Sequence, residues 1–323
     1  DKVFYLWVSV FSLYHISVFW TFMADLYTKE QSNRLFAFIA AGASAGALVG
    51  PSIPSFFAES LGPELMLIAA VLLIIPIVLS FYLERLKVTD LHNESVHVDL
   101  AKTQIGGSSL AGFKMFFTNP YLLGIGAFLL FYTALGSFTY FAQTDVLRGF
   151  DEVVRVKYLA RVDLIVNILT FAIGMFATSR IVTRFGMSIT LALVPVIIVA
   201  GMFILAFAPI MIVALTLQVV RRAGNYGITR PAREMLFTAL DRETRFKAKP
   251  VIDVALYRGG DAVWGNVYAY LSDGLGFGLA VMAAIGAGLA AVWAIVGYWL
   301  GGMFNRQKTD QEEEPSSTNQ QTR

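Results

Sequence analysis

Charged and amide side chains recur at helical spacing within three otherwise apolar stretches of the sequence. They are Asp163, Asn167, Thr170 and Gly174, with Arg161 close by; Gln218, Arg222, Asn225 and Thr229, with Arg221 beside them; and Asp253, Tyr257, Asp261, Trp264 and Tyr268, with Arg258 among them. Spacings of three and four residues place side chains on one face of a helix. An ionised group at the centre of a membrane helix costs about 2.5–3.5 kcal/mol, so it usually faces a cavity or a partner. We therefore expect at least one stripe to line a solute pathway.

The charges in these stripes favour an anionic solute. Arginines outnumber aspartates in and beside them, and a guanidinium offers a fixed fork of donors that matches phosphate or carboxylate. The aspartates would orient the solute or take up protons. Two structural alternatives stay open: Arg258 and Asp261 could neutralise each other across one helical turn, and Arg221 and Arg222 could reach the membrane interface. The candidate solute-binding residues are Arg161, Asp163, Asn167, Arg221, Arg222, Asn225, Arg258 and Asp261.

Long apolar blocks supply the helices that would position these side chains. Hydrophobic residues make up 56% of the 323, charged residues make up 15%, and the mean hydropathy is +0.63. A helix needs about 20 apolar residues to cross a bilayer. Nine such blocks occur, at 3–24, 35–57, 65–83, 121–142, 158–179, 188–208, 210–229, 251–271 and 277–304. The sequence thus predicts an all-α, polytopic membrane helix bundle.

The distribution of Lys and Arg predicts the orientation of the bundle, because short cytoplasmic loops collect positive charge. If the first span begins on the external side, the basic segments lie on the cytoplasmic side. These segments are 29–34, 85–114, 180–184, 230–249 and the tail after 304. One external loop, with Arg148, Arg155 and Lys157, goes against the rule. We expect a multi-pass protein of the cell inner (cytoplasmic) membrane with a cytoplasmic C-terminus and the lipid bilayer as its surroundings.

An odd number of spans with an external start fits a twelve-helix bundle that lacks its first three helices. The long polar connection then becomes the linker between two halves. We expect the last three helices of an N-terminal bundle at 1–83, a cytoplasmic linker at 84–120, a six-helix C-terminal bundle at 121–304 and a disordered tail at 305–323. We expect the protein to be monomeric.

Glycines supply a further signal about packing and flexibility. Gly42, Gly46 and Gly50 recur every fourth residue and are followed by Pro51, a pattern that lets two membrane helices approach closely. Gly259 and Gly260 stand together inside an apolar block, where they predict a local break with backbone groups facing a ligand.

Several functional classes are excluded or weakened by composition. The chain has no cysteine, so disulfides and thiolate chemistry are excluded, and its three histidines suggest neither a metal site nor a cofactor. A net charge of +2 does not indicate nucleic acid. The basic residues at 230–249 fit orientation charges, although a basic vestibule for phosphates is the alternative.

Two other classes stay open beside transport. A membrane-embedded lipid-modifying enzyme would need an acidic metal cluster or a nucleophile with a base, and no aligned group of that kind occurs in the apolar blocks. A non-transporting receptor on a carrier fold would share every feature above. We expect a transporter, and no enzyme.

Two short motifs resemble those of the major facilitator superfamily. Gly46-x-x-x-Gly50-Pro51 resembles the core of its fifth-helix antiporter motif, and residues 179–186 resemble a degenerate copy of its basic loop motif between helices eight and nine. The upstream glycine and the trailing double glycine of the antiporter motif are absent. Both motifs fall where a chain lacking three leading helices would place them.

Longer stretches are similar to bacterial relatives of the ATP/ADP translocases. They are residues 19–25 with 34–42, and residues 230–237 with 247–249 and 257–261, and the resemblance covers essentially the whole chain. It implies a twelve-helix carrier that moves nucleotides, often by exchange, through alternating access of a central site.

Overall fold

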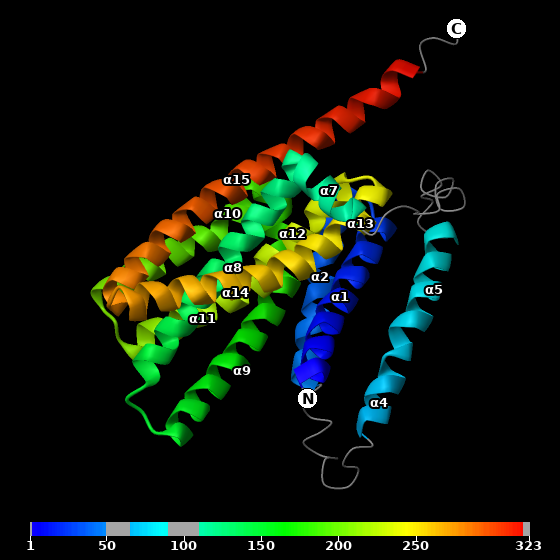
Figure 1. Cartoon of the computed structure of the whole chain (residues 1–323). Coiled ribbons are helices and arrows are strands. Elements are labelled where there is room, and N and C mark those ends of the chain that lie inside the picture. Colours follow the sequence, from blue (N-terminus) through cyan, green and yellow to red (C-terminus); the bar gives the residue numbers. More distant parts are fainter. Residues whose placement is uncertain (1, 50–64, 90–109, 319–323) are drawn as a thin grey trace.

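The computed structural model describes residues 2–49, 65–89 and 110–318, and within these ranges every regular element is a helix (Figure 1). The first helices are α1 (Lys2–Leu26), α2 (Lys29–Val49), α4 (Leu65–Leu72), α5 (Ile74–Thr89) and α7 (Ala111–Thr118). They are followed by α8 (Pro120–Leu147), α9 (Glu152–Phe176), α10 (Thr178–Phe207), α11 (Met211–Gly224), η2 (Asn225–Thr229), α12 (Arg230–Leu236) and η3 (Phe237–Ala239). The last are α13 (Arg242–Pro250), η4 (Val251–Leu256), α14 (Tyr257–Ala269), η5 (Tyr270–Gly274) and α15 (Leu279–Thr318). The prediction of an all-α bundle is confirmed.

Four stretches in the described part of the chain are long and apolar enough to cross a membrane. They are Pro120–Leu147, Tyr158–Phe176, Thr178–Phe207 and Leu279–Arg306, with shorter apolar helices at Val10–Leu26 and Ala70–Leu83. The remaining predicted blocks coincide with α2, with α11 and η2, and with η4 and α14, which carry more polar side chains. The number of nine spans therefore stays a prediction.

The helices after residue 119 form one packed body around α8. α8 begins where the Asn119 side chain accepts hydrogen bonds from the backbone N–H groups of Tyr121 and Leu122, with Pro120 in the first turn. α15 packs against α10 and α8, α14 packs against α8, and α11 lies among α8, α9 and α10. This body includes the candidate stripes on α9, α11 and α14.

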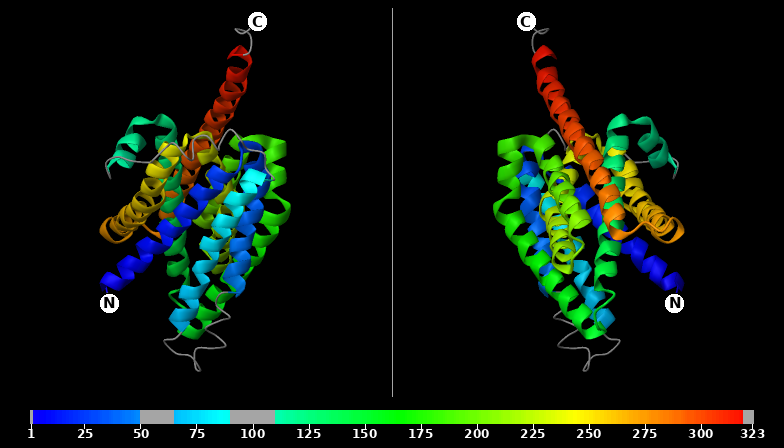
Figure 2. Two further views of the ribbon diagram at one scale, coloured as in Figure 1. Left: turned by 90° about the vertical axis from the view of Figure 1, so that its right-hand side faces the viewer. Right: turned by 90° about the vertical axis from the view of Figure 1, so that its left-hand side faces the viewer.

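The leading helices meet this body at one end of α1. α2 packs against α9, α10 and α12, while α1 packs against α13 and η4 (Figures 1 and 2). Trp20, Met23 and Leu26 near the end of α1 are buried, whereas Trp7 and Tyr14 nearer its start are exposed. α4 and α5 lie at the edge of the molecule beside α1, and most of their described side chains are exposed.

The contact between α10 and α15 depends on glycine. A β-carbon at Gly301 would overlap the backbone of Ser188, whereas one at Gly288 on the same helix would meet nothing within 4 Å. We expect Gly301→Ala to destabilise the protein by about 1–3 kcal/mol, the usual cost of overpacking. Gly288→Ala is the matched control and should be neutral or slightly stabilising. Thermal unfolding in detergent measures both, and equal midpoints would show that the two helices do not approach this closely.

The close helix contact of α2 lies at other residues than the predicted glycines. Gly42 and Gly46 face open space, and the close approach of α2 instead involves Ala37 and Ala41, which lie against Gly174 of α9. The helices thus meet at small residues one turn nearer the start of α2, because the alanines occupy the face toward α9. Gly50 and Pro51 lie outside the described residues.

No break occurs at Gly259 and Gly260, since α14 is continuous across both. Gly260 instead lies where α14 approaches Thr133 of α8, and a side chain there would overlap the threonine hydroxyl. The helix is distorted earlier, in the π-helical segment η4. η4 follows Pro250, which has no backbone N–H for the helical ladder.

The π-helical segment η2 has a similar cause. Pro231 in the first turn of α12 cannot donate to the carbonyl of Gly227, four residues earlier, and the Thr178 hydroxyl donates to that carbonyl instead at 2.6 Å. π-helical turns occur frequently at functional sites. Both segments adjoin the cavities described below.

Two segments predicted as polar connections are helical. α12 and α13 extend the helices on either side of a short turn at 237–241, so the segment at 230–249 is packed structure and not a solvated loop. α15 continues to Thr318, through most of the tail expected to be disordered. Gln and Glu, which are frequent at 307–314, are good helix formers.

Candidate functional site

Three tyrosines from different helices separate two neighbouring cavities. Tyr132 of α8, Tyr226 of η2 and Tyr257 of α14 line both, and the cavities measure about 230 and 330 Å³. The ring centroids of Tyr132 and Tyr257 lie 6.2 Å apart. We call these residues the tyrosine trio. Because each ring offers a flat apolar face and a polar hydroxyl, the trio suits a planar, partly polar solute.

The larger cavity is arginine-rich. Arg221 is only 7% exposed, its Nε donates to Gln218 Oε1 at 3.1 Å, and its Cζ lies 5.8 Å from the centroid of the Tyr132 ring. Within residues 2–49, 65–89 and 110–318, Arg221 forms no ion pair. A buried guanidinium with one neutral hydrogen-bond partner leaves donors free for a bound anion.

Arg222 lies on the wall of the same cavity and joins two helices. Its Nη1 forms an ion pair of 2.5 Å with Asp163 Oδ1 of α9, and the side chains are 29% and 57% exposed. Asn167 Nδ2 donates to the Asp163 carbonyl at 3.0 Å. The structure therefore brings together candidates from two of the three stripes.

The third stripe, at 253–268, contributes fewer of the candidate charged residues to the cavity walls. Asp261 lines the larger cavity, but Arg258 Nη1 lies 3.9 Å from Asp261 Oδ2 and both side chains are more than 40% exposed. This geometry fits the alternative in which the two residues neutralise each other. Arg258 and Arg161 line neither cavity, and the exposed Arg161 lies over the Tyr158 ring at 5.9 Å.

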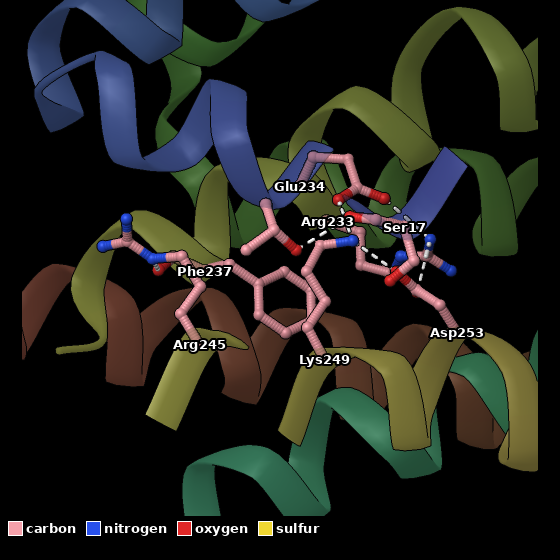
Figure 3. Close-up of polar contacts among 8 residues, drawn as sticks. Ser17, Arg233, Glu234, Phe237, Arg245, Lys249 and Asp253 are labelled. Atoms are coloured by element: carbon pink, nitrogen blue, oxygen red, sulfur yellow. Dashed lines mark hydrogen bonds and ion pairs between the residues drawn. The ribbon is translucent and has the colours of Figure 1, made fainter. Parts of the chain in front are cut away.

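The smaller cavity borders a buried network of four charges (Figure 3). Arg233 Nη2 lies 2.8 Å from Glu234 Oε1 and 3.3 Å from Asp253 Oδ1. Lys249 Nζ lies 3.0 Å from Glu234 Oε2 and also contacts Asp253 Oδ2. Two positive and two negative charges cancel, which allows all four to be buried. We call these residues the buried network.

Only part of this network was predicted from the sequence. Asp253 belonged to a stripe, but Arg233 and Lys249 were interpreted as orientation charges or a vestibule, and Glu234 was not singled out. Lys249 is fully buried over the Phe237 ring, so neither interpretation describes it. Lys249 and Asp253 are one helical turn apart, and this spacing could have predicted their ion pair. Arg230 and Asn225 also line the smaller cavity.

A separate arginine ties the end of α1 to α13. Arg245 Nη1 donates to the Ala24 carbonyl at 2.7 Å, Nη2 to the Leu240 carbonyl at 2.7 Å, and Nε to the Phe237 carbonyl at 2.9 Å. Its Nη1 also lies 3.3 Å from Asp25 Oδ1. Burial lowers the pKa of the Arg245 guanidinium, and the charge of Asp25 opposes that shift. We call this set of contacts the Arg245 anchor.

The family follows from a match over most of the sequence. Residues 9–239 match the Major Facilitator Superfamily. The chain belongs to the major facilitator superfamily. Members of this superfamily transport solutes across membranes, so the chain is a multi-pass membrane protein of a transporter family. No curated protein matches the chain.

Solved structures of the superfamily share the fold. The chain is similar to the proton:xylose symporter XylE bound to 6-bromo-6-deoxy-D-glucose, at 15% identity and a TM-score of 0.57, over 85% of this chain and 65% of that one. It is also similar to the transporter FucP in the outward conformation, at 16% identity and a TM-score of 0.50, over 84% of this chain and 68% of that one. The chain thus spans about two thirds of each structure, and at these identities the likeness shows the fold alone.

Proposed function

We propose that this superfamily member moves an anionic solute by alternating access, and that nucleotides are the first solutes to test. The observation that supports the anion is Arg221, a buried guanidinium in a cavity, without an ion pair in the described residues. A permanent internal partner would normally accompany a buried charge. A solute phosphate or carboxylate would be that partner.

The tyrosine trio supports the proposal that the solute is a nucleotide. A nucleobase is a flat aromatic surface that stacks on aromatic side chains, and each stacked base contributes about 1–3 kcal/mol in nucleic-acid-binding proteins. The phosphates would then lie at Arg221 and Arg222, with the base at Tyr132 between the two cavities. The resemblance of the sequence to ATP/ADP translocases agrees with this arrangement.

The proposed organisation follows the same resemblance. α1, α2 and α4–α5 would be the last three helices of an N-terminal bundle of twelve-helix architecture, 84–120 the linker, and 121–304 the C-terminal bundle. The tail after 304 would lie in the cytoplasm and the protein would act as a monomer in the inner membrane.

Uptake into proteoliposomes tests the solute class. Labelled ATP, ADP and phosphate should each enter, or compete with one another, while a neutral sugar should not compete. Vesicles preloaded with unlabelled nucleotide should take up label faster if the protein exchanges solutes. Competition by the sugar without any effect of the anions would contradict the proposal.

Arg222→Ala tests the cavity wall. We expect uptake per inserted molecule to fall about tenfold, since a hydrogen bond to a charged group contributes about 1.5 kcal/mol or more. The exposed pair with Asp163 adds about 0–1 kcal/mol to stability, so insertion should be little changed. Arg161→Ala, outside both cavities, is the control. Equal losses of uptake and insertion for Arg222→Ala would make the residue structural.

A further inference from the structure

A groove runs along the outer surface of the C-terminal helices, away from the cavities. It measures about 490 Å³ and lies between α10 and α15. Its residues are Ala192 and Val196 of α10 and Ala294, Ile295, Tyr298, Trp299, Gly302, Met303 and Arg306 of α15. Ala294 is buried, whereas Val196, Ile295, Tyr298 and Trp299 are more than half exposed. Ala192, Gly302 and Met303 are intermediate. We call this the α10–α15 groove.

The groove has the length of one membrane leaflet. Ala294, Tyr298, Gly302 and Arg306 follow each other every fourth residue, so they lie along one face of α15. Twelve residues of helix rise about 18 Å. Half of the hydrocarbon core is about 15 Å thick. An acyl chain aligned with α15 would therefore fill the groove from its deep end to Arg306.

The groove ends at a positive charge. Residues 279–305 contain no Asp, Glu, Lys or Arg, so Arg306 is the first charged residue of α15. It is exposed, and within residues 110–306 no ion pair joins it to another side chain. Tyr298 and Trp299 lie within two turns of it, and such aromatic residues are enriched at membrane interfaces. Arg306 is thus at the depth of lipid headgroups.

We propose that the α10–α15 groove binds an acidic phospholipid. One acyl chain lies over Ala192, Ala294 and Gly302, and the negatively charged headgroup pairs with Arg306. The charge at one end and the apolar length behind it match an amphiphile with a single anionic end. The alternative occupant is a second copy of the chain, which would have to place a carboxylate beside Arg306.

The lipid preference is measured on the delipidated protein in detergent. Native mass spectrometry and thermal unfolding compare phosphatidylglycerol with phosphatidylcholine of identical acyl chains. We expect phosphatidylglycerol to bind more tightly by on the order of fivefold, the effect of one basic residue at an acidic surface. Equal binding of both lipids by the unaltered protein would overturn the proposal.

Two variants separate the headgroup from the chain. Arg306→Gln should abolish the difference between the two lipids and leave phosphatidylcholine binding unchanged. Gly302→Leu should weaken both lipids, because it fills the groove floor where the nearest atom to a β-carbon is Ser188 Oγ at 3.9 Å. Arg184→Gln, an exposed arginine of α10 outside the groove, is the control and should keep the preference.

Other results would identify another occupant. If the protein is dimeric in detergent and Gly302→Leu separates the copies, the groove is a protein interface and the proposal is wrong. If Arg306→Gln keeps the full preference for phosphatidylglycerol, the headgroup binds elsewhere and the proposal is also wrong. None of these outcomes depends on which solute the protein transports.

Discussion

Replacing Arg221 with glutamine should lower transport of an anionic solute by about 10-fold to 100-fold. The side chain is buried in the larger cavity with Gln218 as its hydrogen-bond partner. Hydrogen bonds to charged groups contribute about 1.5–3 kcal/mol, and the loss of one of them from the bound anion corresponds to this fold-change. Initial uptake rates at several solute concentrations, divided by the amount of inserted protein, measure the effect.

Two further variants keep the Arg221 prediction specific. Arg221→Lys retains the charge but loses the fork of donors, so it should recover part of the activity. Arg148→Gln removes an exposed arginine after α8 that lies outside both cavities and should transport normally. If the Arg221→Gln variant binds the solute with the same affinity as the unaltered protein, the proposal that this cavity binds an anion is wrong.

Lys249→Met should destabilise the protein by about 3–5 kcal/mol, the largest stability effect expected for any single change considered. Without the ammonium group, Glu234 and Asp253 share only Arg233 inside a buried site. Removing one partner leaves an uncompensated buried charge, which costs about this much in other proteins. Thermal unfolding and the yield of folded protein in detergent measure the loss.

The double variant Lys249→Met with Glu234→Gln distinguishes charge from shape. It restores neutrality by leaving the pair of Arg233 and Asp253, so it should be more stable than Lys249→Met alone. Lys247→Met is the matched control: the partly buried Lys247 lies outside the buried network and pairs with the exposed Glu243 at 2.5 Å, and pairs open to water contribute about 0–1 kcal/mol. A double variant no better than the single one would mean that Lys249 acts through packing.

The sequence predicted the helices well because their signal is local. Blocks of about 20 apolar residues, such as those that became α8 and α10, identify membrane helices without any knowledge of their neighbours. The aligned polar residues on α9 and α11 likewise predicted Arg222 and Asp163, which the structure places in contact. Periodicity within a helix was sufficient to single out these two residues, and their role in solute binding stays a prediction.

Contacts between helices were harder to predict. Tyr132 carried no signal in a block rich in aromatic residues, yet it lines both cavities. Lys249 resembled an orientation charge because its acidic neighbour Glu234 lies on another helix. The π-helical segments near Pro231 and Pro250 also depend on what neighbouring helices offer, as the Thr178 hydroxyl shows.

The Arg245 anchor sets a condition on any movement of α1. The guanidinium donates to carbonyls of α1 and of the turn before α13, so separating these elements would leave several strong polar groups without partners at once. In the alternating access proposed above, a rearrangement that moves the end of α1 away from α13 would therefore have to release this one arginine.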